Sequence, residues 1–491
     1  MYLGLDYGTS EIKALLIDAA GNIVHTHGVS LSIQRPQPHW SEQSAAEWWQ
    51  ATNDLMAAMR EKSGNDWQQV KAIGLSGQMH GAVLLDAADN VLRPVILWND
   101  TRSAAECAEL ETAVPDLHAI TGNLAMPGFT APKLLWVAKH EPEIFAQTAA
   151  VLLPKDYIRL LMTGKKISEM SDAAGTLWLD VAKRDWSDEV LAACQLSRQH
   201  IPALIEGSQN SGTLLPDVAA LWGLSENVIV AGGGGDNAAS AVGVGAVQAG
   251  DAFISLGTSG VVFVVNNSYR PAPENAVHCF CHALPYRWHQ MSVMLSAAAG
   301  LSWYCQLVGV SETELLGEIA ALSAEDKAAA PIFLPYLSSE RTPHNDAHAA
   351  GMFYGLRHSA NRAVMGYAVI EGVSFGIADG VRVLQESGTE IQQASLLGGG
   401  ARSSLWAQLL ADILQFDIVT HKGGATGGAL GAARLAALAD GKNEAEVCHK
   451  PEIDRVYRPE ATHTADLSKR YAQFQALYKM DLAFRQASAK H

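Results

Sequence analysis

Two stretches of the chain share one hydrophobic pattern: an apolar strand, a Gly-Thr-Ser turn and a second strand rich in aliphatic residues. The first, residues 1–18, runs through an apolar segment to Asp6 and turns at Gly8-Thr9-Ser10. The second, residues 252–265, repeats the pattern around Gly257-Thr258-Ser259. Apolar runs bounded by glycine-containing turns predict β-hairpins. Two copies in similar half-chains predict duplicated domains that face one another.

Polar residues at the first turn indicate phosphate chemistry. Thr9 and Ser10 place hydroxyls beside backbone N–H groups, a combination suited to phosphate oxygens. Asp6 is a carboxylate at the end of an apolar strand, where it can bind Mg²⁺ directly or through water. Lys13, on the following strand, either faces the phosphates or is simply exposed. The alternative is an ordinary hairpin in which Asp6 caps the turn; the second copy favours two turns that grip one polyphosphate.

A run of four glycines, Gly232 to Gly235, follows the apolar strand 228–231 and precedes Asp236. Glycines weaken a core, so the run indicates close approach of the backbone to a ligand. Small apolar residues from 238 to 244 then predict a helix. Asp236 is either a helix cap or a base that accepts the proton of a substrate hydroxyl. A helix N-terminus favours ionised Asp and so weakens it as a base, but phosphoryl transfer asks mainly for orientation of the nucleophile.

A second strand with glycines lies near the end of the chain. Residues 394–397 form an apolar run that leads into Gly398-Gly399-Gly400. One glycine at a strand-to-helix turn is common, whereas three in a row favour close approach of a flat ligand such as adenosine.

Other patterns outline the rest of the fold. Residues 104–224 predict mostly helices broken by prolines, an insertion that walls in a substrate. Residues 245–250 are the predicted domain boundary. Apolar periodicity predicts a long helix over 362–386 and a last helix over 467–484, and residues 423–431 open a helix of small residues.

Composition narrows the class of protein. The 491 residues, 48% hydrophobic and 18% charged, are enough for two large globular domains. A net charge of −16 argues against a nucleic-acid surface. We expect no leader peptide and no membrane-spanning stretch, so the expected compartment is the cytoplasm. The spacing of glycines and lysines fits neither a P-loop nor a dinucleotide-binding turn.

The cysteines do not suggest a disulfide framework, although one cluster resembles a metal site. It is the run His278-Cys279-Phe280-Cys281-His282. Alternation along a strand puts 278, 280 and 282 on one face and the cysteines on the other. Because four ligands split in this way cannot surround one zinc ion, we expect the run to belong to the core.

These features together resemble the FGGY family of carbohydrate kinases. Residues 128–140, with Thr130, Lys133 and Trp136, resemble the first family signature, and residues 351–372 resemble the second. The resemblance covers nearly the whole chain. It implies two actin-like (ribonuclease-H-like) α/β domains, spanning 1–245 and 246–491, that close on ATP and a sugar.

Two positions depart from the family pattern. Val364 stands where an acidic or amide side chain is usual, and we interpret it as a detail of the helix surface. Glu11 stands where a glycine is frequent, which adds an acidic neighbour near the expected phosphate site of the first turn.

Within the family, several motifs resemble the subfamily that phosphorylates D-xylulose. They are 41–43, 77–81, 98–100, 154–157 and 171–176. Glycerol kinases carry an Arg-Glu pair in place of Met79-His80. The resemblance implies roles by position: sugar contacts for Met79, His80 and Asn237; proton acceptance for Asp236; Mg-ATP for Asp6; phosphates for Gly257, Thr258 and Ser259; and adenosine for Gly399, Gly400 and Ala401.

The expected function is therefore ATP-dependent phosphorylation of D-xylulose with Mg²⁺, and the family resemblance implies a homodimer. Alternatives are the same reaction on another ketose or polyol, such as ribulose or gluconate. A more distant alternative is an actin-like or Hsp70-like ATPase that acts on a protein partner.

Overall fold

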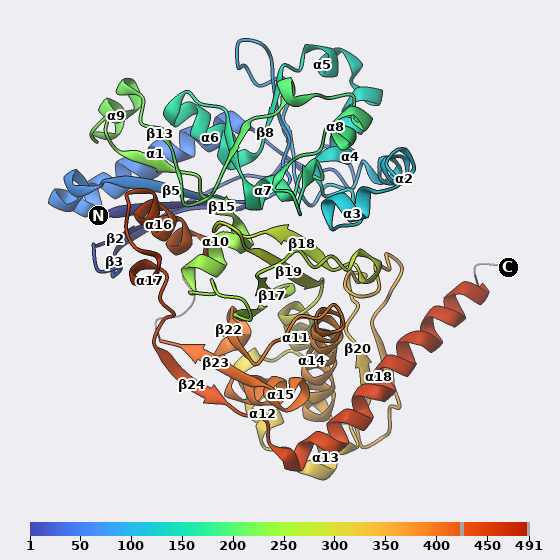
Figure 1. Cartoon of the computed structure of the whole chain (residues 1–491). Helices are drawn as coiled ribbons and strands as arrows, with labels where there is room; N and C mark the ends of the chain where they lie inside the picture. The colour runs from blue at the N-terminus through green and yellow to red at the C-terminus, as the bar shows by residue number, and fades with distance from the viewer. Residues whose placement is uncertain (423–426, 489–491) are drawn as a thin grey trace.

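A computed structural model describes residues 1–422 and 427–488, and its two largest sheets organise the molecule (Figure 1). The first sheet has the order β13-β14-β5-β1-β2-β3, with β15 paired to β5. Its strands are β1 (Tyr2–Tyr7), β2 (Glu11–Ile17), β3 (Ile23–Ser30), β5 (Ala72–Gly77), β13 (Asn210–Thr213), β14 (Ile229–Ala231) and β15 (Gly234–Gly235).

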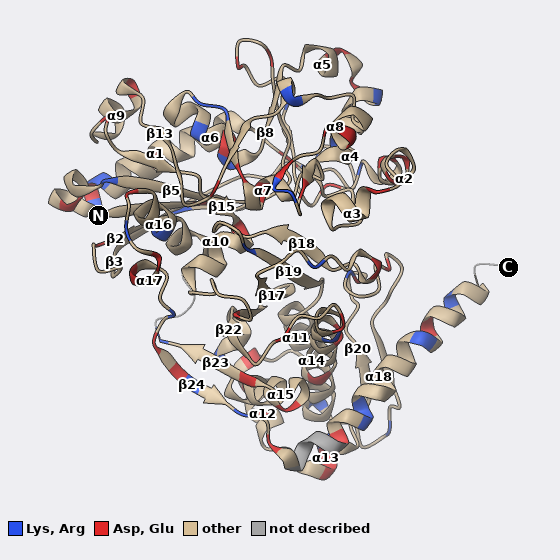
Figure 2. Ribbon diagram, viewed as in Figure 1, with Lys and Arg blue, Asp and Glu red and all other residues tan. Residues whose placement is uncertain are grey.

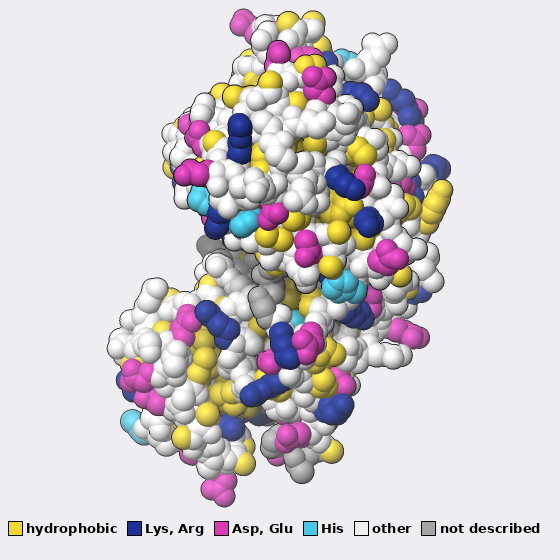
Figure 3. Space-filling model, turned by 90° about the vertical axis from the view of Figure 1, so that its left-hand side faces the viewer, with side chains coloured by type: hydrophobic (Ala, Val, Ile, Leu, Met, Phe, Trp, Pro, Cys, Tyr) yellow, Lys and Arg dark blue, Asp and Glu magenta, His cyan; other side chains and the backbone are white. Residues whose placement is uncertain are grey.

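The second sheet has the order β18-β19-β17-β16-β22-β23-β24. Its strands are β16 (Ala252–Leu256), β17 (Gly260–Asn266), β18 (His278–Cys281), β19 (Trp288–Met294), β22 (Gln393–Leu397), β23 (Asp417–His421) and β24 (Ile453–Tyr457). In the space-filling view the two parts of the molecule form two lobes that meet at a narrower waist (Figure 3).

The two predicted hairpins are confirmed, and they occupy equivalent places in the two sheets. β1 pairs antiparallel with β2 and parallel with β5. β16 pairs antiparallel with β17 and parallel with β22 in the same way. Because a parallel partner ends at the same edge as the strand beside it, each Gly-Thr-Ser turn lies next to the end of another strand.

Helices α10 (Asp236–Gly243) and α16 (Gly427–Ala439) pack so closely that their contacts require glycine. A Cβ atom on Gly431 would lie 1.7 Å from the carbonyl oxygen of Ala239. α16 also lies on the first sheet, where a Cβ atom on Gly4 would lie 1.9 Å from the carbonyl oxygen of Ala429. This contact explains the predicted small-residue helix, whose expected first residues, 423–426, lie outside the described part. It also returns a C-terminal segment to the N-terminal lobe.

The region 104–224 contains more strand than predicted. Its helices are α2 (Ala104–Ala113), α3 (Leu117–Thr121), α4 (Thr130–His140), α5 (Pro142–Gln147), α6 (Pro154–Thr163), α7 (Met170–Ala174), α8 (Asp188–Ala193) and α9 (Pro216–Trp222). Short strands lie between them: β8 (Ala150–Leu152), β9 (Ile167–Glu169), β10 (Leu179–Asp180), β11 (Asp185–Trp186) and β12 (Ala203–Ile205). The expectation of a mostly helical insertion was therefore incomplete, since β13 joins the first sheet.

The longest core helix of the second lobe, α14 (Arg362–Glu386), corrects one expectation. By length and composition alone it could cross a membrane, although no such stretch was expected. In the structure 94% of its apolar window is buried. Val369, Val373 and Ile377 pack in the core beneath the second sheet. α14 is therefore the core helix that covers this sheet.

The remaining elements surround these sheets. In the first lobe they are β4 (Glu42–Gln43), α1 (Ala45–Ser63), β6 (Val83–Leu85) and β7 (Val95–Ile96). In the second lobe they are α11 (Ala298–Val308), α12 (Glu312–Ala320), α13 (Ala324–Ala328), β20 (Ile332–Leu334), β21 (Met352–Tyr354), α15 (Ser404–Leu414) and α18 (Ala461–Ser488); α17 (Glu444–Val447) lies beside α16.

Candidate active site

Strand register brings Asp6 and Asp236 together from distant parts of the chain. Across the first sheet Asp6 is level with Ser76 of β5, and Ser76 is level with Gly234 of β15. Adjacent strands are about 4.8 Å apart, so the end of β1 and the end of the glycine run share one edge of the sheet. Asp236 follows at once as the first residue of α10.

The environment of Asp236 differs from the sequence-based expectation. Gly235, not Asp236, is the residue before the helix, so Asp236 is not the helix cap. Its Oδ1 atom accepts hydrogen bonds from the backbone and the side-chain nitrogens of Asn237, at 2.7 and 3.0 Å. Burial, and then the charge of Asp6, raise the pKa of Asp236 to about 6. Burial therefore outweighs the helix N-terminus, and Asp236 is a stronger base than we expected.

Asp6 is a partly buried carboxylate with one hydrogen-bond partner among the described residues, and it fits a divalent cation. Its Oδ1 atom accepts a hydrogen bond of 2.8 Å from Ser76. Burial raises the pKa of Asp6 and outweighs the Ser76 hydrogen bond and the Lys13 charge, which both lower it. The pKa values of the neighbouring Asp6 and Asp236 carboxyls are both raised. Their oxygen atoms therefore form a site that a hard cation, which prefers oxygen ligands, would stabilise in the ionised form.

A cavity of about 340 Å³ opens beside Asp236, and both lobes line it. Cavities of this size hold small-molecule ligands. Four of the predicted sugar or catalytic residues line it together with Ser259 of the second turn: Met79, His80, Asp236 and Asn237. The remaining lining residues include Trp98, Gly128, Phe129, His278, Phe280 and Arg341.

His80 presents a hydrogen-bond acceptor to this cavity. Its Nδ1 atom lies 2.6 Å from the carbonyl oxygen of Gly175. A carbonyl cannot donate, so Nδ1 carries the proton and Nε2 keeps its lone pair. Burial, with the nearby Lys133 charge, lowers the pKa of His80 to about 3, which keeps the ring neutral. A substrate hydroxyl can therefore donate to Nε2.

Residues of the first signature motif hydrogen-bond the backbone of His80. The Lys133 ammonium donates to the carbonyl oxygens of His80 and Gly128, each at 2.8 Å. Thr130 donates to the same His80 carbonyl oxygen at 3.2 Å. His80 has a φ of +71°, in the left-handed region that most side chains avoid. These bonds hold the strained turn in place.

The second Gly-Thr-Ser turn and the glycine run of residues 398–400 are neighbours. β16 and β22 pair in parallel, with Ser255 level with Leu397. A Cβ atom on Gly398 would lie 2.8 Å from the carbonyl oxygen of Leu256, and Gly398 has a φ of +85°. The predicted phosphate turn and the predicted adenosine loop therefore lie side by side. Ala401 and Gly398 line a separate cavity of about 480 Å³.

The first turn shows fewer free groups than predicted. The Thr9 hydroxyl donates to Gln78 at 3.1 Å and accepts from the Trp98 indole at 2.9 Å. Lys13 is level with Asp6 in the sheet, but its side chain is 60% exposed and pairs with Glu11 at 3.2 Å. Ser10 is exposed. Phosphate binding by Thr9, Ser10 and Lys13 stays a prediction.

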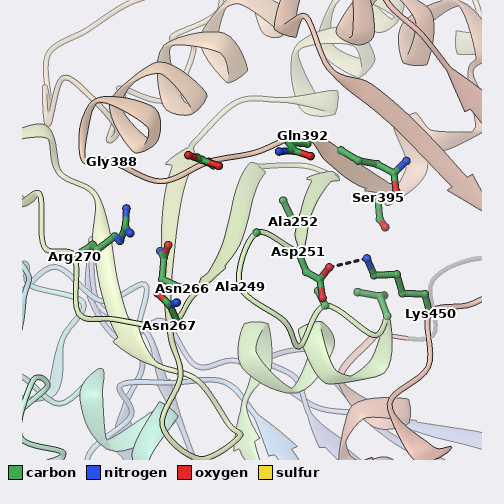
Figure 4. Close-up of a pocket in the computed structure, with 15 residues that line it drawn as sticks. Ala249, Asp251, Ala252, Asn266, Asn267, Arg270, Gly388, Gln392, Ser395 and Lys450 are labelled. Atoms are coloured by element: carbon green, nitrogen blue, oxygen red, sulfur yellow. Dashed lines mark ion pairs between the residues drawn. The ribbon is translucent and has the colours of Figure 1, made fainter. Parts of the chain in front are cut away.

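A further polar cavity, of about 460 Å³, lies away from these groups (Figure 4). Asp251, Ala252 and Asn266 line it, at the start of β16 and the end of β17. A strand of five residues is about 17 Å long, so this cavity is separated from the Gly257–Ser259 turn by the length of β16. An ion pair of 2.6 Å between Asp251 and Lys450 crosses it.

A buried charge network lies behind the site, on α6 and α7, where Figure 2 shows charged positions inside the first lobe. The Lys155 ammonium lies 2.9 Å from both Asp156 and Asp172 and 3.3 Å from Glu169, and none of these side chains is exposed. Burial raises the pKa of Asp172 to about 8. Lys155 and Asp156 belong to the sequence motif at 154–157, and Asp172 belongs to the motif at 171–176.

The same network holds the two ends of the candidate site. Arg159 donates to the carbonyl oxygen of Gly232. Ser171, at the start of α7, accepts a hydrogen bond of 3.0 Å from the N–H of Gly235. Gly175, just after α7, accepts the His80 hydrogen bond. α7 therefore connects the residue before Asp236 to the histidine across the cavity.

Several lining residues were missed in the sequence. Phe129 lies inside the first signature and Trp98 inside a quoted motif, so both had a signal. His278 and Phe280 were assigned to the core; both are buried, but they also line the cavity, so that assignment was incomplete. Arg341 lies in the loop between β20 and β21 and carried no signal.

Comparison with known proteins places the chain in a family. The model for the N-terminal domain of the FGGY family of carbohydrate kinases matches residues 1–243, and the model for the C-terminal domain matches residues 252–439. The chain is 53% identical to the xylulose kinase of Escherichia coli over 482 residues, which cover 98% of this chain and 99% of the relative.

Solved structures agree with this fold. A structure described as a xylulose kinase ("xyloylose kinase") from Brucella ovis superposes with a TM-score of 0.95 at 50% identity, covering 98% of this chain and 99% of the other. A gluconate kinase from Lactobacillus acidophilus superposes with a TM-score of 0.89 at 25% identity, covering 99% and 97%. The predicted fold class and family are confirmed. The chain belongs to the FGGY family of carbohydrate kinases, phosphotransferases built from two actin-like domains.

Proposed function

We propose that the chain transfers the γ-phosphoryl group of ATP to the 5-hydroxyl of D-xylulose, giving ADP and D-xylulose 5-phosphate for pentose catabolism. The observation that carries the proposal is the cavity that combines a neutral acceptor histidine, His80, with a base of raised pKa, Asp236. The choice of D-xylulose is supported by the xylulose kinases of high identity. The gluconate kinase neighbour keeps another ketose or a sugar acid as the second candidate.

Asp236 accepts the proton of the attacking hydroxyl. As the sugar oxygen bonds to the γ-phosphorus, the bond between that phosphorus and the β–γ bridging oxygen breaks, and ADP leaves. Met79, His80 and Asn237 hold the sugar in reach of Asp236, because all of them line the same cavity. Fixing the hydroxyl near the phosphorus supplies much of the rate enhancement in such reactions.

We assign the nucleotide to the second lobe and to the edge of the first sheet where β1 and the glycine run end. Gly257, Thr258 and Ser259 hold the distal phosphates, Gly399, Gly400 and Ala401 hold adenosine, and Thr9, Ser10 and Lys13 approach the phosphates from the first lobe. Asp6 would hold Mg²⁺, which would supply neutralisation of the phosphate charge. We also propose that the enzyme works in the cytoplasm, as a homodimer and without a membrane or nucleic-acid partner.

Product identification tests this proposal. Incubation of the purified chain with Mg-ATP and D-xylulose should give equal amounts of ADP and a sugar monophosphate whose phosphorus NMR coupling places the phosphate on C5. Release of inorganic phosphate in place of a sugar phosphate would contradict it.

The pH dependence of kcat/KM for the sugar should show an acidic limb near pH 6. Asp236 works only when ionised, and burial with the Asp6 charge raises its pKa to about 6. Below that pH the base is protonated, so kcat/KM should fall about tenfold for each further unit. The check is a profile from pH 5 to 8 with the affinity for ATP measured in parallel. A flat profile would exclude Asp236 as the titrating base.

A further inference from the structure

Arg341 is a charged side chain without a partner at the wall of the sugar cavity. It comes from the second lobe, whereas Met79, His80 and Asp236 come from the first. Among residues 1–422 and 427–488, its guanidinium group makes no ion pair and donates no hydrogen bond. Burial lowers the pKa of Arg341, while the nearby Glu340 raises it without an ion pair between the two side chains. Hydrogen-bond donors that lose water without gaining a partner raise the free energy of the folded chain, unless a ligand accepts from them.

The neighbouring acid does not neutralise Arg341. Glu340 is 4% exposed, and its Oε1 atom accepts backbone hydrogen bonds from Leu295 and Arg341 at 3.0 and 2.7 Å. Burial raises the pKa of Glu340 to about 8, so at neutral pH the carboxyl is largely protonated. The donors of the guanidinium group are therefore available to a molecule in the cavity.

His278 supplies an acceptor beside these donors. Its Nδ1 atom lies 3.1 Å from Oδ1 of Asn123. The Asn123 amide nitrogen donates to two backbone carbonyls, at 2.8 and 3.0 Å, which fixes Oδ1 as an acceptor. Nδ1 of His278 therefore carries the proton, and Nε2 keeps its lone pair. Nε2 makes no hydrogen bond to any described residue, and His278 lines the cavity.

Aromatic packing holds these groups at one end of the cavity. His278 stacks on Phe280 with ring centroids 5.6 Å apart, and Phe129 lies between His80 and His278, at 4.6 and 5.7 Å. Thr342, the residue after Arg341, donates a hydrogen bond of 2.8 Å to the carbonyl oxygen of Ala276 and accepts one of 3.1 Å from Val293, while His278 is level with Met291, so Arg341 lies on the wall that β18 and β19 form. Arg341 and His278 therefore line the second-lobe side of the cavity, whereas Asp236, which takes the reacting hydroxyl, comes from the first lobe.

We propose that Arg341 and His278 bind the non-reacting end of the sugar, where Arg341 donates to the C2 carbonyl oxygen and His278 accepts from an adjacent hydroxyl. This inference rests on the proposed function and deepens it by naming what selects a 2-ketose. A polyol has a hydroxyl at C2, which has weaker acceptor strength than a carbonyl toward a cationic donor. The sugar also bridges the two lobes through Arg341.

Arg341→Met tests the proposal by direct binding and by selectivity. Trp98 lines the same cavity, so its fluorescence reports binding of D-xylulose without ATP. Loss of a charge-assisted bond should weaken D-xylulose binding about 10- to 100-fold. Because xylitol lacks the carbonyl, its weaker binding should change less than about threefold, so the preference for ketose over polyol collapses. Arg341→Lys should recover part of the preference.

Arg270→Met is the matched control, because Arg270 lies in the same lobe, is partly buried and lines the separate cavity of Figure 4. It should leave sugar binding unchanged. Equal losses for D-xylulose and xylitol in Arg341→Met, or no loss for either, would overturn the proposal. A wild-type chain that phosphorylates gluconate and not D-xylulose would overturn the proposed function instead. Thermal unfolding without sugar should show no loss of stability in Arg341→Met, since the variant removes a partly buried charge that has no partner among the described residues.

Discussion

Replacing Asp236 with Asn should lower kcat for sugar phosphorylation about 10²- to 10⁴-fold, the usual contribution of a positioned base. The amide keeps the shape of the side chain and an oxygen that can accept from Asn237, but it cannot take the proton of the 5-hydroxyl. Asp236 lines the 340 Å³ cavity assigned to the sugar, whereas Ala401 lines the separate 480 Å³ cavity. The dissociation constant of ATP should therefore stay within about threefold. Single-turnover kinetics with equilibrium ATP binding make the measurement.

Asp251→Asn is the matched control for this prediction. Asp251 also accepts backbone hydrogen bonds, from Val247 and Gln248 at 3.0 and 2.7 Å. It lies just before β16, at the end of that strand away from the Gly257–Ser259 turn. The control should keep kcat close to that of the wild type. An Asp236→Asn variant that retains more than a tenth of wild-type kcat would contradict the role of Asp236.

Replacing Lys155 with Met should destabilise the first lobe by about 3–5 kcal/mol, the usual result when one partner of a buried ion pair is removed. Lys155 lies among Asp156, Glu169 and Asp172 and is fully buried with them. Without it, the carboxyls have Arg159 as their remaining nearby cation, which pairs with Asp156. Urea unfolding, followed separately for each lobe because a two-domain chain need not unfold in one step, gives the free energy.

The comparison variant is Lys183→Met. Lys183 also lies in the first lobe and pairs with Asp180 at 2.6 Å, but its side chain is 79% exposed. Exposed pairs contribute little to stability, so this variant should unfold with the wild type. If Lys155→Met unfolds at the same urea concentration as Lys183→Met, the network does not stabilise the lobe.

Local patterns predicted the elements that depend on local sequence. Both hairpins, the helix at 362–386 and the strands before each glycine run follow from apolar runs and turn residues. The small residues around 431 were noticed, but the sequence did not show what they pack against. Gly431 of α16 contacts α10, and Gly4 of β1 contacts α16, and these segments are far apart in the sequence. Short strands in the region 104–224 were missed, since strands of two to four residues show too little periodicity to be recognised.

The candidate site was predicted unevenly for the same reason. Asp236 was found from the glycine run before it, and His80 from the family resemblance. The pKa of Asp236, however, depends on burial and on Asp6, which only strand register brings near. Arg341 was missed because it lies in an irregular loop of the second lobe. His278 was read as core because alternation shows which residues share a face, not what that face meets.

The measurement that tests the account most directly is ADP release by the purified chain with Mg-ATP, with and without sugar. D-xylulose, ribulose, gluconate and glycerol are compared at equal concentration. The account predicts strong stimulation by D-xylulose, and weak or no stimulation by the others. A rate that does not respond to any sugar would contradict a carbohydrate kinase with this cavity, and would favour an ATPase that acts on a protein partner.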